Sequence, residues 1–481
     1  MRILLASSEV HPYSKTGGLA DMVGALAKTL ARAGHQVGLA TPLYAGVREH
    51  FPQLNALDIP LELPLGPQSV SAKIYTLNPS PNLTIYFVDV PRFYDRPELY
   101  GYNGVDYPDN AERFIFLSKS VAYLACHLPW SPEIVHLNDW QTGLAALFLR
   151  HQAKTAGQGS FPGVCLTIHN LAYQGLFPSG QYPLANLPWE YFNVDGVEFY
   201  GRMSCLKAGL VFSGVLTTVS PRYSREILTP ELGCGLDGLL RTRQNALFGI
   251  LNGSDYEIWN PLTDPYIQSY SPADFTGKAR NKELLQKELG LPADPSIPLF
   301  GSIGRLVEQK GVDIMMAAVP EMMQHKLQFV LLGNGTPDCE ARFAAFTNRF
   351  PSQFAMRGGY DEALSHRIEA GADFFVMPSR FEPCGLNQMY SLRYGTIPIV
   401  RATGGLDDTV IDVREDAEKA NGIKFHDHSS QALSKAVRKA LTLYAEPELF
   451  HQFRINAMSA DFSWDRTAAA YINVYKRAVQ Q

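Results

Sequence analysis

Short apolar runs ending in small or polar residues recur along the first half of the chain, with helical patterns between several of them. The runs are Ile3–Ala6, Val37–Ala40, Leu83–Val90, Ile134–Leu137, Val164–Ile168 and Val215–Val219. The clearest helical pattern places apolar residues at three- and four-residue spacing from Leu19 to Leu30 and stops at Gly34. Strands that alternate with helices in this way predict a parallel sheet with crossover helices, an α/β fold.

The pattern breaks between residues 252 and 277, where turn-forming pairs such as Asp264-Pro265 replace the apolar periodicity. A second series of runs then follows, at Leu299–Ile303, Phe329–Leu332, Phe374–Met377 and Ile397–Val400. Because 481 residues exceed the usual size of one α/β core, two domains are expected. We expect a Rossmann-like domain at 1–251, a connection at 252–277, a second Rossmann-like domain at 278–460, and a C-terminal helix within 461–481 that packs back on the first domain.

The form TGGLxD occurs twice, at Thr16–Asp21 and at Thr403–Asp408, each time after a predicted strand and at the start of a predicted helix. Two related halves would explain the repeat. Chance similarity over six residues would explain it as well.

Composition excludes several classes of partner. The formal charge is −5, from 42 basic and 47 acidic residues without a long run of either sign, which argues against nucleic acid and anionic membranes. The six cysteines have no metal-ligand spacing, so neither zinc nor a disulfide framework is expected. No segment is long and apolar enough for a membrane span, and strand-like residues follow Met1 directly. We expect a bacterial cytoplasmic protein, or a plastid protein whose leader has been removed.

Charged and glycine-bearing turns follow several predicted strands. In open parallel sheets ligands bind at the carboxyl ends of strands, where helix amino termini attract anions. Lys15-Thr16-Gly17-Gly18 follows the first strand and is neither a Walker loop nor GxGxxG. Arg305 and Lys310 follow a strand of the second half, where two cations would suit a diphosphate. Glu382 follows another strand, where a carboxylate could bind sugar hydroxyls or stabilise a positive anomeric carbon.

Each of these residues also has a purely structural interpretation. Lys15 could be a solvated lysine in a tight turn, Arg305 and Lys310 could be surface cations, and Glu382 could cap a helix. His169, which closes a strand, could be a buried histidine without a catalytic role, and Cys384 suits packing better than nucleophilic attack.

Together these segments resemble the bacterial glycogen synthase and plant starch synthase family of retaining glucosyltransferases (glycosyltransferase family 5). The likeness runs through nearly the whole chain in the family's order. The matching segments are Ser8-Glu9-Val10, Lys15–Asp21, Tyr94–Pro97, His136–Trp140, His169–Gly175, Asn252-Gly253, Gly304-Arg305, Lys310-Gly311, Tyr360, Ser379–Gly385 and Thr403–Thr409. The departures are His11 and Ser254, which stand where the family usually has a smaller and an aliphatic residue.

The resemblance implies the α/β GT-B fold, with two Rossmann-like doubly wound domains facing each other across a deep cleft. It also implies transfer of glucose from ADP-glucose to the 4-hydroxyl of an α-1,4-glucan with retention, without a cofactor or a metal. The catalytic residues that it implies are Lys15, Asp21, His169, Arg305, Lys310 and Glu382. The donor-binding residues are Lys15, Gly18, Asn252, Arg305, Lys310, Tyr360, Cys384, Gly385, Gly404, Gly405 and Thr409, with Tyr360 against the adenine. The acceptor-binding residues are Glu9, Tyr94, Asp139 and Trp140.

Three other classes fit the sequence less well. A nicotinamide dehydrogenase needs glycine spacing in the first turn and an acidic residue after the second strand, where Thr41-Pro42 stands. A glycan phosphorylase needs a pyridoxal-binding lysine, which no local sequence suggests. A catalytically silent glucan-binding subunit would be expected to lose the charged residues that this chain keeps.

Overall fold

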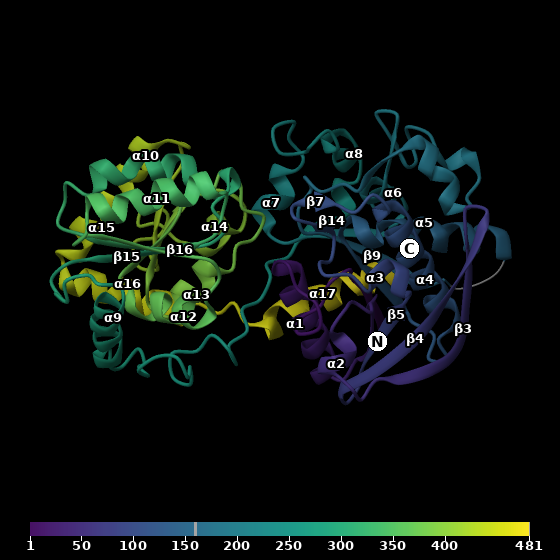
Figure 1. Cartoon of the computed structure of the whole chain (residues 1–481), viewed down its shortest axis with the longest axis horizontal. Coiled ribbons are helices and arrows are strands. Elements are labelled where there is room, and N and C mark those ends of the chain that lie inside the picture. Colours follow the sequence, from purple (N-terminus) through teal and green to yellow (C-terminus); the bar gives the residue numbers. More distant parts are fainter. Residues whose placement is uncertain (158–160, 481) are drawn as a thin grey trace. The chain divides into compact units, whose positions relative to one another are not determined.

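The computed structural model describes residues 1–157 and 161–480 and divides into two compact units. Unit 1 comprises Met1–Val219, Ser224–Gly253 and the chain from Trp464 onward, and unit 2 comprises Ser220–Tyr223 and Ser254–Ser463. The two series of strands predicted from the sequence fall into separate sheets, one in each unit (Figure 1).

Unit 1 contains a nine-stranded sheet with the order β14-β13-β9-β8-β1-β2-β5-β4-β3. Its strands are β1 (Arg2–Ala6), β2 (Gln36–Pro42), β3 (Asn55–Leu65), β4 (Gln68–Ser80), β5 (Leu83–Asp89), β8 (Ile134–Asn138), β9 (Gly163–Ile168), β13 (Val215–Thr218) and β14 (Leu247–Gly249). The strands from β14 to β5 pair in parallel, whereas β4 pairs antiparallel with β5 and forms an antiparallel hairpin with β3 at one edge.

Helices of unit 1 join these strands. The main ones are α1 (Gly18–Arg32), α4 (Asn110–His127), α5 (Asp139–Ala156), α6 (Cys205–Phe212), α8 (Asp237–Thr242) and α17 (Trp464–Val479), with short helices α2 (Val47–His50) and α3 (Pro91–Tyr94). Helix α1 matches the predicted Leu19–Leu30 pattern, and Gly34 beyond its end has a φ of 86°. Short strands β6 (Gly101–Tyr102) and β7 (Val105–Asp106) pair together, as do β10 (Leu176–Pro178), β11 (Glu198–Phe199) and β12 (Arg202–Ser204).

Unit 2 contains a parallel six-stranded sheet with the order β17-β16-β15-β18-β19-β20. The strands are β15 (Leu299–Ile303), β16 (Gln328–Gly333), β17 (Phe354–Gly358), β18 (Phe374–Met377), β19 (Ile397–Arg401) and β20 (Ile423–Phe425). The helices are α9 (Thr276–Glu288), α10 (Val312–Met322), α11 (Pro337–Arg349), α12 (Glu362–Gly371), α13 (Asn387–Arg393), α14 (Gly404–Thr409), α15 (Ser430–Tyr444) and α16 (Pro447–Ser459), and α7 (Pro221–Glu226) spans the two units.

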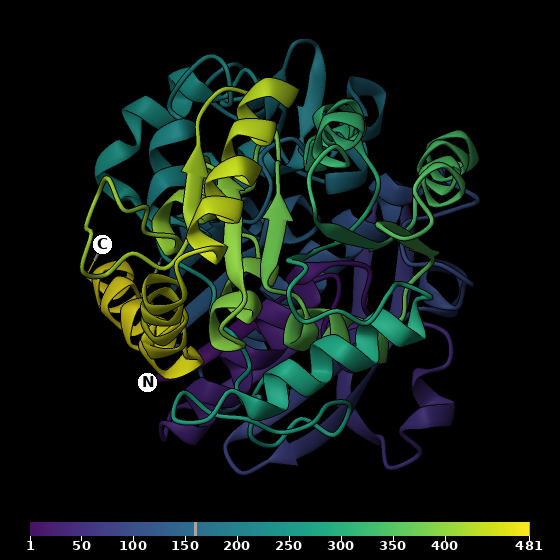
Figure 2. The ribbon, with the colours of Figure 1, turned by 90° about the vertical axis from the view of Figure 1, so that its left-hand side faces the viewer.

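The sheet of unit 2 is covered by helices on both faces because its side chains alternate between two apolar clusters. Phe300, Phe329 and Phe374 pack with α10, α11 and α15, whereas the neighbouring Leu299, Val330 and Phe375 pack with α9, α12 and α14. Figure 1 shows α10 and α11 on one side of the strands and α12 on the other. In Figure 2 the teal helix α9 lies on one side of the green strands. This is a doubly wound sheet, as the sequence predicts.

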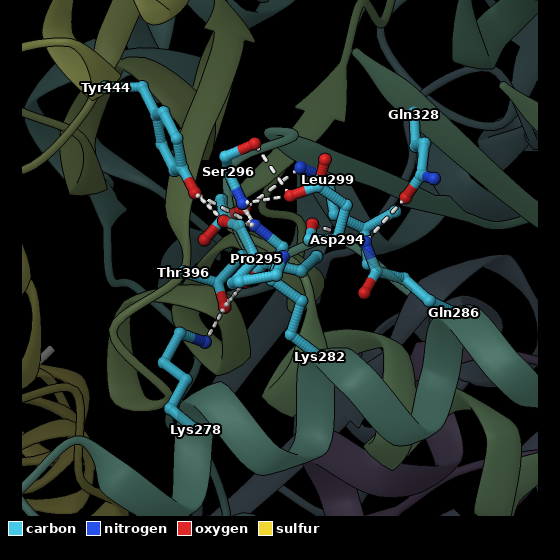
Figure 3. Close-up of polar contacts among 12 residues, drawn as sticks. Lys278, Lys282, Gln286, Asp294, Pro295, Ser296, Leu299, Gln328, Thr396 and Tyr444 are labelled. Atoms are coloured by element: carbon cyan, nitrogen blue, oxygen red, sulfur yellow. Dashed lines mark hydrogen bonds and ion pairs between the residues drawn. The ribbon is translucent and has the colours of Figure 1, made fainter. Parts of the chain in front are cut away.

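A buried polar network closes the amino-terminal edge of this sheet (Figure 3). Lys282 Nζ contacts Asp373 Oδ2 at 2.7 Å and donates to Tyr444 Oη at 2.9 Å, while Lys278 Nζ donates to Thr396 Oγ1 at 2.6 Å. Gln286 Nε2 on the same helix donates to Gln328 Oε1 at 2.7 Å. These two lysines therefore join α9 to the sheet at the edge opposite the strands' carboxyl ends.

The segment expected to be a connection, 252–277, is packed almost entirely as part of unit 2. The Trp259 ring stacks on His366 at 3.8 Å and on Tyr390 at 4.0 Å between ring centroids. The buried Asp264 accepts hydrogen bonds from His366 Nδ1 at 2.7 Å and from the Tyr394 hydroxyl at 2.5 Å. The structure therefore places other boundaries: the main segment of unit 2 runs from Ser254 to Ser463, and the chain returns to unit 1 at Trp464.

The C-terminal helix α17 belongs to unit 1. Tyr475 and Tyr471 lie against His136, and the Tyr475 hydroxyl is 2.7 Å from His136 Nδ1. Thr467 Oγ1 donates to Leu251 O at 3.0 Å.

No helix in residues 1–157 or 161–480 is both long and apolar enough to cross a membrane.

Candidate functional site

The carboxyl edge of the unit 2 sheet gathers most of the residues predicted to bind a donor. Its strand order reverses between β15 and β18, and ligands of open α/β sheets bind at such a reversal. Gly304, Arg305 and the 3-10 helix η4 (Glu308–Lys310) follow β15, and the segment 379–385 follows β18. The two turns are therefore neighbours at one edge.

Lys310 and Glu382 form an ion pair between these two turns. Lys310 Nζ lies 2.6 Å from Glu382 Oε2, and Ser379 Oγ donates to the same oxygen at 3.0 Å. The Glu382 side chain is 7% exposed and that of Lys310 is 29% exposed. A lysine ammonium has three donors, so Lys310 can hold the carboxylate and still offer N–H groups to a phosphate.

The turn that precedes α14 packs against the backbone around Glu382. A β-carbon added at Gly404 would lie 1.9 Å from Glu382 O, and one added at Gly405 would lie 2.0 Å from Cys384 O. The Gly405 N–H donates to Glu382 O at 3.1 Å. Only glycine fits at these two positions, because the Gly404-Gly405 turn packs directly against the backbone of the Glu382 turn.

Other predicted donor residues occupy different positions at this edge. Arg305 is exposed, and Tyr360 after the edge strand β17 is 77% exposed. Cys384 is buried, which agrees with packing rather than nucleophilic attack. Thr409 Oγ1 is buried and donates to Gly405 O at 2.6 Å, so its hydroxyl supports the turn from inside α14.

Gly385 follows Cys384 in a left-handed conformation, with a φ of 74°. The buried Gln388 donates from Nε2 to Cys384 O at 3.0 Å and to Gly385 O at 2.9 Å. Gln388 and Ser379 therefore fix the segment that carries Glu382. Sequence reasoning gave neither residue a role, because a glutamine on a helix and a serine after a strand have many structural uses.

In unit 1 the corresponding edge lies where β1 adjoins β8. Glu9 and Lys15 follow β1, and Lys15 Nζ pairs with Asp21 Oδ1 at 2.8 Å in the first turn of α1. Gly18 is the first residue of α1. The predicted residues of this loop thus lie together at the carboxyl edge.

Asp139 and His169 lie together at the ends of β8 and β9, where Asp139 is buried and His169 is half-buried. Asp139 Oδ1 accepts the His169 backbone N–H at 2.7 Å. Burial raises the pKa of Asp139 to about 7, and the nearby Glu9 raises it further. The backbone N–H groups of His169 and Asn170 act in the opposite direction and lower this pKa. Burial lowers the pKa of His169 to about 3, so its imidazole is neutral.

Asn138 sets the tautomer of His169. Asn138 Nδ2 donates to Ala6 O at 3.0 Å, which leaves Oδ1 as the acceptor for His169 Nε2 at 2.9 Å. His169 Nε2 therefore carries the proton, and Nδ1 is the acceptor of the neutral ring. Sequence reasoning assigned no role to Asn138.

Two predicted acceptor residues lie in apolar packing. Tyr94 is fully buried, and its hydroxyl donates to Arg113 O at 2.9 Å, so the structure assigns it to the core and corrects the predicted glucan contact. Trp140 is partly buried and packs on Phe114 and Phe177, with Gly175 against its ring.

Asn252 lies at the end of unit 1, next to Gly253. Its side chain is buried, and Oδ1 has no hydrogen-bond partner in the structure. An acceptor left without a partner at this position suits a ligand donor such as a sugar hydroxyl.

Within the described residues, no group of three or more His, Cys, Asp or Glu side chains could hold a metal ion.

Paired α/β units with cations, glycine turns and a carboxylate at the carboxyl edges of parallel sheets define the class of nucleotide-sugar glycosyltransferases. Family models agree: residues 2–242 match the starch synthase catalytic domain and residues 281–459 match glycosyl transferases group 1. The chain belongs to the glycogen and starch synthase family.

Relatives match over their full length. A glycogen synthase of Anaeromyxobacter sp. (strain Fw109-5) is 48% identical over 99% of both chains. Glycogen synthase 2 of Nitrosococcus oceani is 44% identical over 100% of this chain and 98% of its own. Among solved structures, the catalytic domain of starch synthase IV from Arabidopsis thaliana, bound to ADP and acarbose, superposes with a TM-score of 0.89 at 34% identity, over 100% and 99% of the two chains. The predicted GT-B class is confirmed.

Proposed function

We propose that the protein extends an α-1,4-glucan by transferring glucose from ADP-glucose to the 4-hydroxyl at the non-reducing end, with retention of configuration. The observation that carries this proposal is the Lys310–Glu382 pair beside Arg305 at the strand-order reversal of unit 2, in a chain related over its full length to glycogen synthases. The ADP and acarbose bound to the starch synthase IV relative support a nucleotide donor and a glucan acceptor.

In this proposal, Arg305 and Lys310 act on the diphosphate that leaves. As the bond between C1 of glucose and the phosphate oxygen breaks, negative charge grows on the diphosphate. Arg305 and Lys310 stabilise that charge, which in many enzymes is the largest contribution to catalysis. Glu382, held by Ser379 and Lys310, faces the sugar, where its charge stabilises an oxocarbenium-like transition state.

Retention follows from attack on the same face. The acceptor 4-oxygen bonds to C1 on the face that the diphosphate leaves, and its proton passes to the departing phosphate oxygen. We also propose donor-binding roles for Lys15, Gly18 and Asn252 of unit 1 and for Tyr360, Gly404 and Gly405 of unit 2. Asp21 and His169 are proposed to act on the glucose. Trapping a glucosyl-enzyme adduct would contradict this route.

The proposal includes no cofactor and no metal, because protein cations carry the charge of the leaving group. The proposed partner is an α-1,4-glucan such as glycogen, starch or a malto-oligosaccharide, without nucleic acid or membrane. The proposed location is the bacterial cytoplasm, which the bacterial origin of the relatives supports.

Transfer of label into polymer tests the proposal. The protein is incubated with glycogen, EDTA and radiolabelled ADP-glucose or UDP-glucose, and the labelled polymer is then digested with an exo-hydrolase specific for α-1,4 bonds. We expect incorporation from ADP-glucose in EDTA, with all label released by the hydrolase. Absence of incorporation from ADP-glucose, or label resistant to the hydrolase, would refute the proposal.

A further inference from the structure

Glu9 is a buried carboxylate beneath the loop that carries Lys15. Glu9 lies three residues after β1 and is 4% exposed. Its Oε2 accepts the backbone N–H of Thr16 at 2.5 Å and that of Gly17 at 3.2 Å. Thr16 Oγ1 lies 3.0 Å from Oε1 and 3.1 Å from Oε2, and the Tyr100 hydroxyl donates to Oε1 at 3.0 Å.

These contacts use the acceptor capacity of Glu9. An ionised carboxylate offers about four lone-pair positions. Two backbone N–H groups and the hydroxyls of Thr16 and Tyr100 approach them. Tyr100 is itself fixed, since its hydroxyl lies 2.7 Å from Ser8 Oγ. A glucan hydroxyl would have to displace one of these internal donors to reach Glu9.

The loop on top of Glu9 is fixed on both sides of Lys15. On one side, Val10 and Ser14 exchange backbone hydrogen bonds of 3.0 and 2.9 Å. On the other side, Glu9 holds Thr16 and Gly17. The Lys15 side chain is 42% exposed, and its ammonium is aimed by Asp21. Glu9 therefore controls the backbone on which Lys15 stands.

We propose that Glu9 is a positioning residue that holds the Lys15-Thr16-Gly17-Gly18 loop for the donor, in place of a direct contact with the acceptor glucan. This inference rests on the proposed donor role of Lys15. The energetic reason is that a buried carboxylate must be satisfied by hydrogen bonds, and here the loop supplies them. Removing the carboxylate takes away the acceptor that holds the Thr16 and Gly17 N–H groups in place.

Separate measurements of donor and acceptor affinity test this inference. In Glu9→Ala, we expect ADP affinity and the donor KM to worsen about tenfold or more, as loss of charge-assisted hydrogen bonds predicts, while the glucan KM stays within about twofold. Glu9→Gln keeps one oxygen for the two N–H groups, so its donor effect should be smaller. ADP titration by calorimetry and steady-state kinetics give these values.

Amide hydrogen exchange measures the protection of the backbone amides of this loop directly and does not depend on turnover. In both variants the amides of Thr16 and Gly17 should exchange faster, while those of β1 keep their protection. Glu49→Ala, which removes an exposed carboxylate in the same unit, is the matched control and should leave exchange, ADP affinity and activity unchanged. If Glu9→Ala does not fold, the same measurements are made on Glu9→Gln and on Tyr100→Phe, which removes only one hydroxyl.

A raised glucan KM with unchanged ADP affinity in the Glu9 variants would overturn the inference in favour of an acceptor contact. Unchanged ADP affinity in Lys15→Ala would also overturn the inference, since the loop would then not contribute to binding of the nucleotide. Failure of the proposed function is a separate result, namely no label transferred from ADP-glucose to glycogen by the wild type.

Discussion

At the scale of single residues, burial sets the charge of the polar groups at the carboxyl edge of unit 1. Asp139 is buried and His169 is half-buried, and their pKa values move in opposite directions, up to about 7 and down to about 3. Each group is thereby pushed toward its neutral form, because desolvation penalises the charged form of either.

The raised pKa of Asp139 makes stability depend on pH. Between pH 4 and 7 the folded protein holds a proton on Asp139 that the unfolded chain releases, so stability falls as pH rises, by up to about 1.4 kcal/mol per pH unit. Asp139→Asn removes this effect. We expect the variant to gain stability relative to the wild type from pH 5 to pH 8, measured by urea unfolding. A constant difference between the two proteins would contradict the burial argument.

Replacement of Gly405 should disturb the donor turn, because its position leaves no room for a side chain. A methyl group would lie 2.0 Å from Cys384 O, so Gly405→Ala must push α14 away from the Glu382 turn. We expect kcat/KM to fall at least about tenfold, by analogy with misplaced catalytic groups. Gly180→Ala is the control, because no neighbouring atom lies within 4 Å of the added carbon. Equal activity of the two variants would show that the turn tolerates movement.

At the scale of elements, the chain between Ser254 and α9 is fixed by one aromatic stack and one buried carboxylate. Trp259→Ala removes the ring that lies between His366 and Tyr390. We expect unit 2 to lose about 3 kcal/mol of unfolding free energy, the lower end of the cost of truncating a core tryptophan, because Trp259 is half-buried. Trp189, which is 60% exposed, provides the control substitution Trp189→Ala. Equal losses in both would mean that the stack does not stabilise unit 2.

The sequence predicted the central strands well, because each is a continuous apolar run between helices, as in β1, β8, β15 and β18. It missed β14, β17 and β20, which are short or lie at sheet edges. In unit 1 it also missed the hairpin of β3 and β4. Their side chains are largely exposed, and β3 contains Pro60 and Pro64, which read as turn signals but are tolerated at a sheet edge. It also took 252–277 for a connection, since a stack such as Trp259 on His366 joins residues far apart in sequence.

The candidate site was predictable where its chemistry comes from charged residues or glycines in strand-end turns. Arg305, Lys310, Glu382 and Gly404-Gly405 do lie at one edge of a sheet. The burial of Tyr94 could not be predicted in this way, because it depends on packing against residues that are distant in the sequence. Ser379 and Asn138 act through other side chains and carry no distinctive spacing.

At the scale of the whole molecule, the chain returns to unit 1 through α17. Tyr475→Phe deletes the buried hydroxyl that contacts His136 Nδ1. We expect a loss of about 1–3 kcal/mol, because His136 keeps a buried polar atom without its partner. Calorimetry should place this loss in the transition of unit 1. The control Tyr200→Phe alters an exposed ring and should leave the transition unchanged. A shift confined to unit 2 would contradict the assignment of α17.

The account of the whole enzyme depends most on the cations that stabilise the leaving diphosphate. The direct measurement is kcat/KM for ADP-glucose in Arg305→Ala and Lys310→Ala, with Lys326→Ala, an exposed lysine at the other edge of the sheet, as control. We expect a loss of roughly a hundredfold or more in the first two variants and none in the control. Wild-type kcat/KM in either Arg305→Ala or Lys310→Ala would contradict the account.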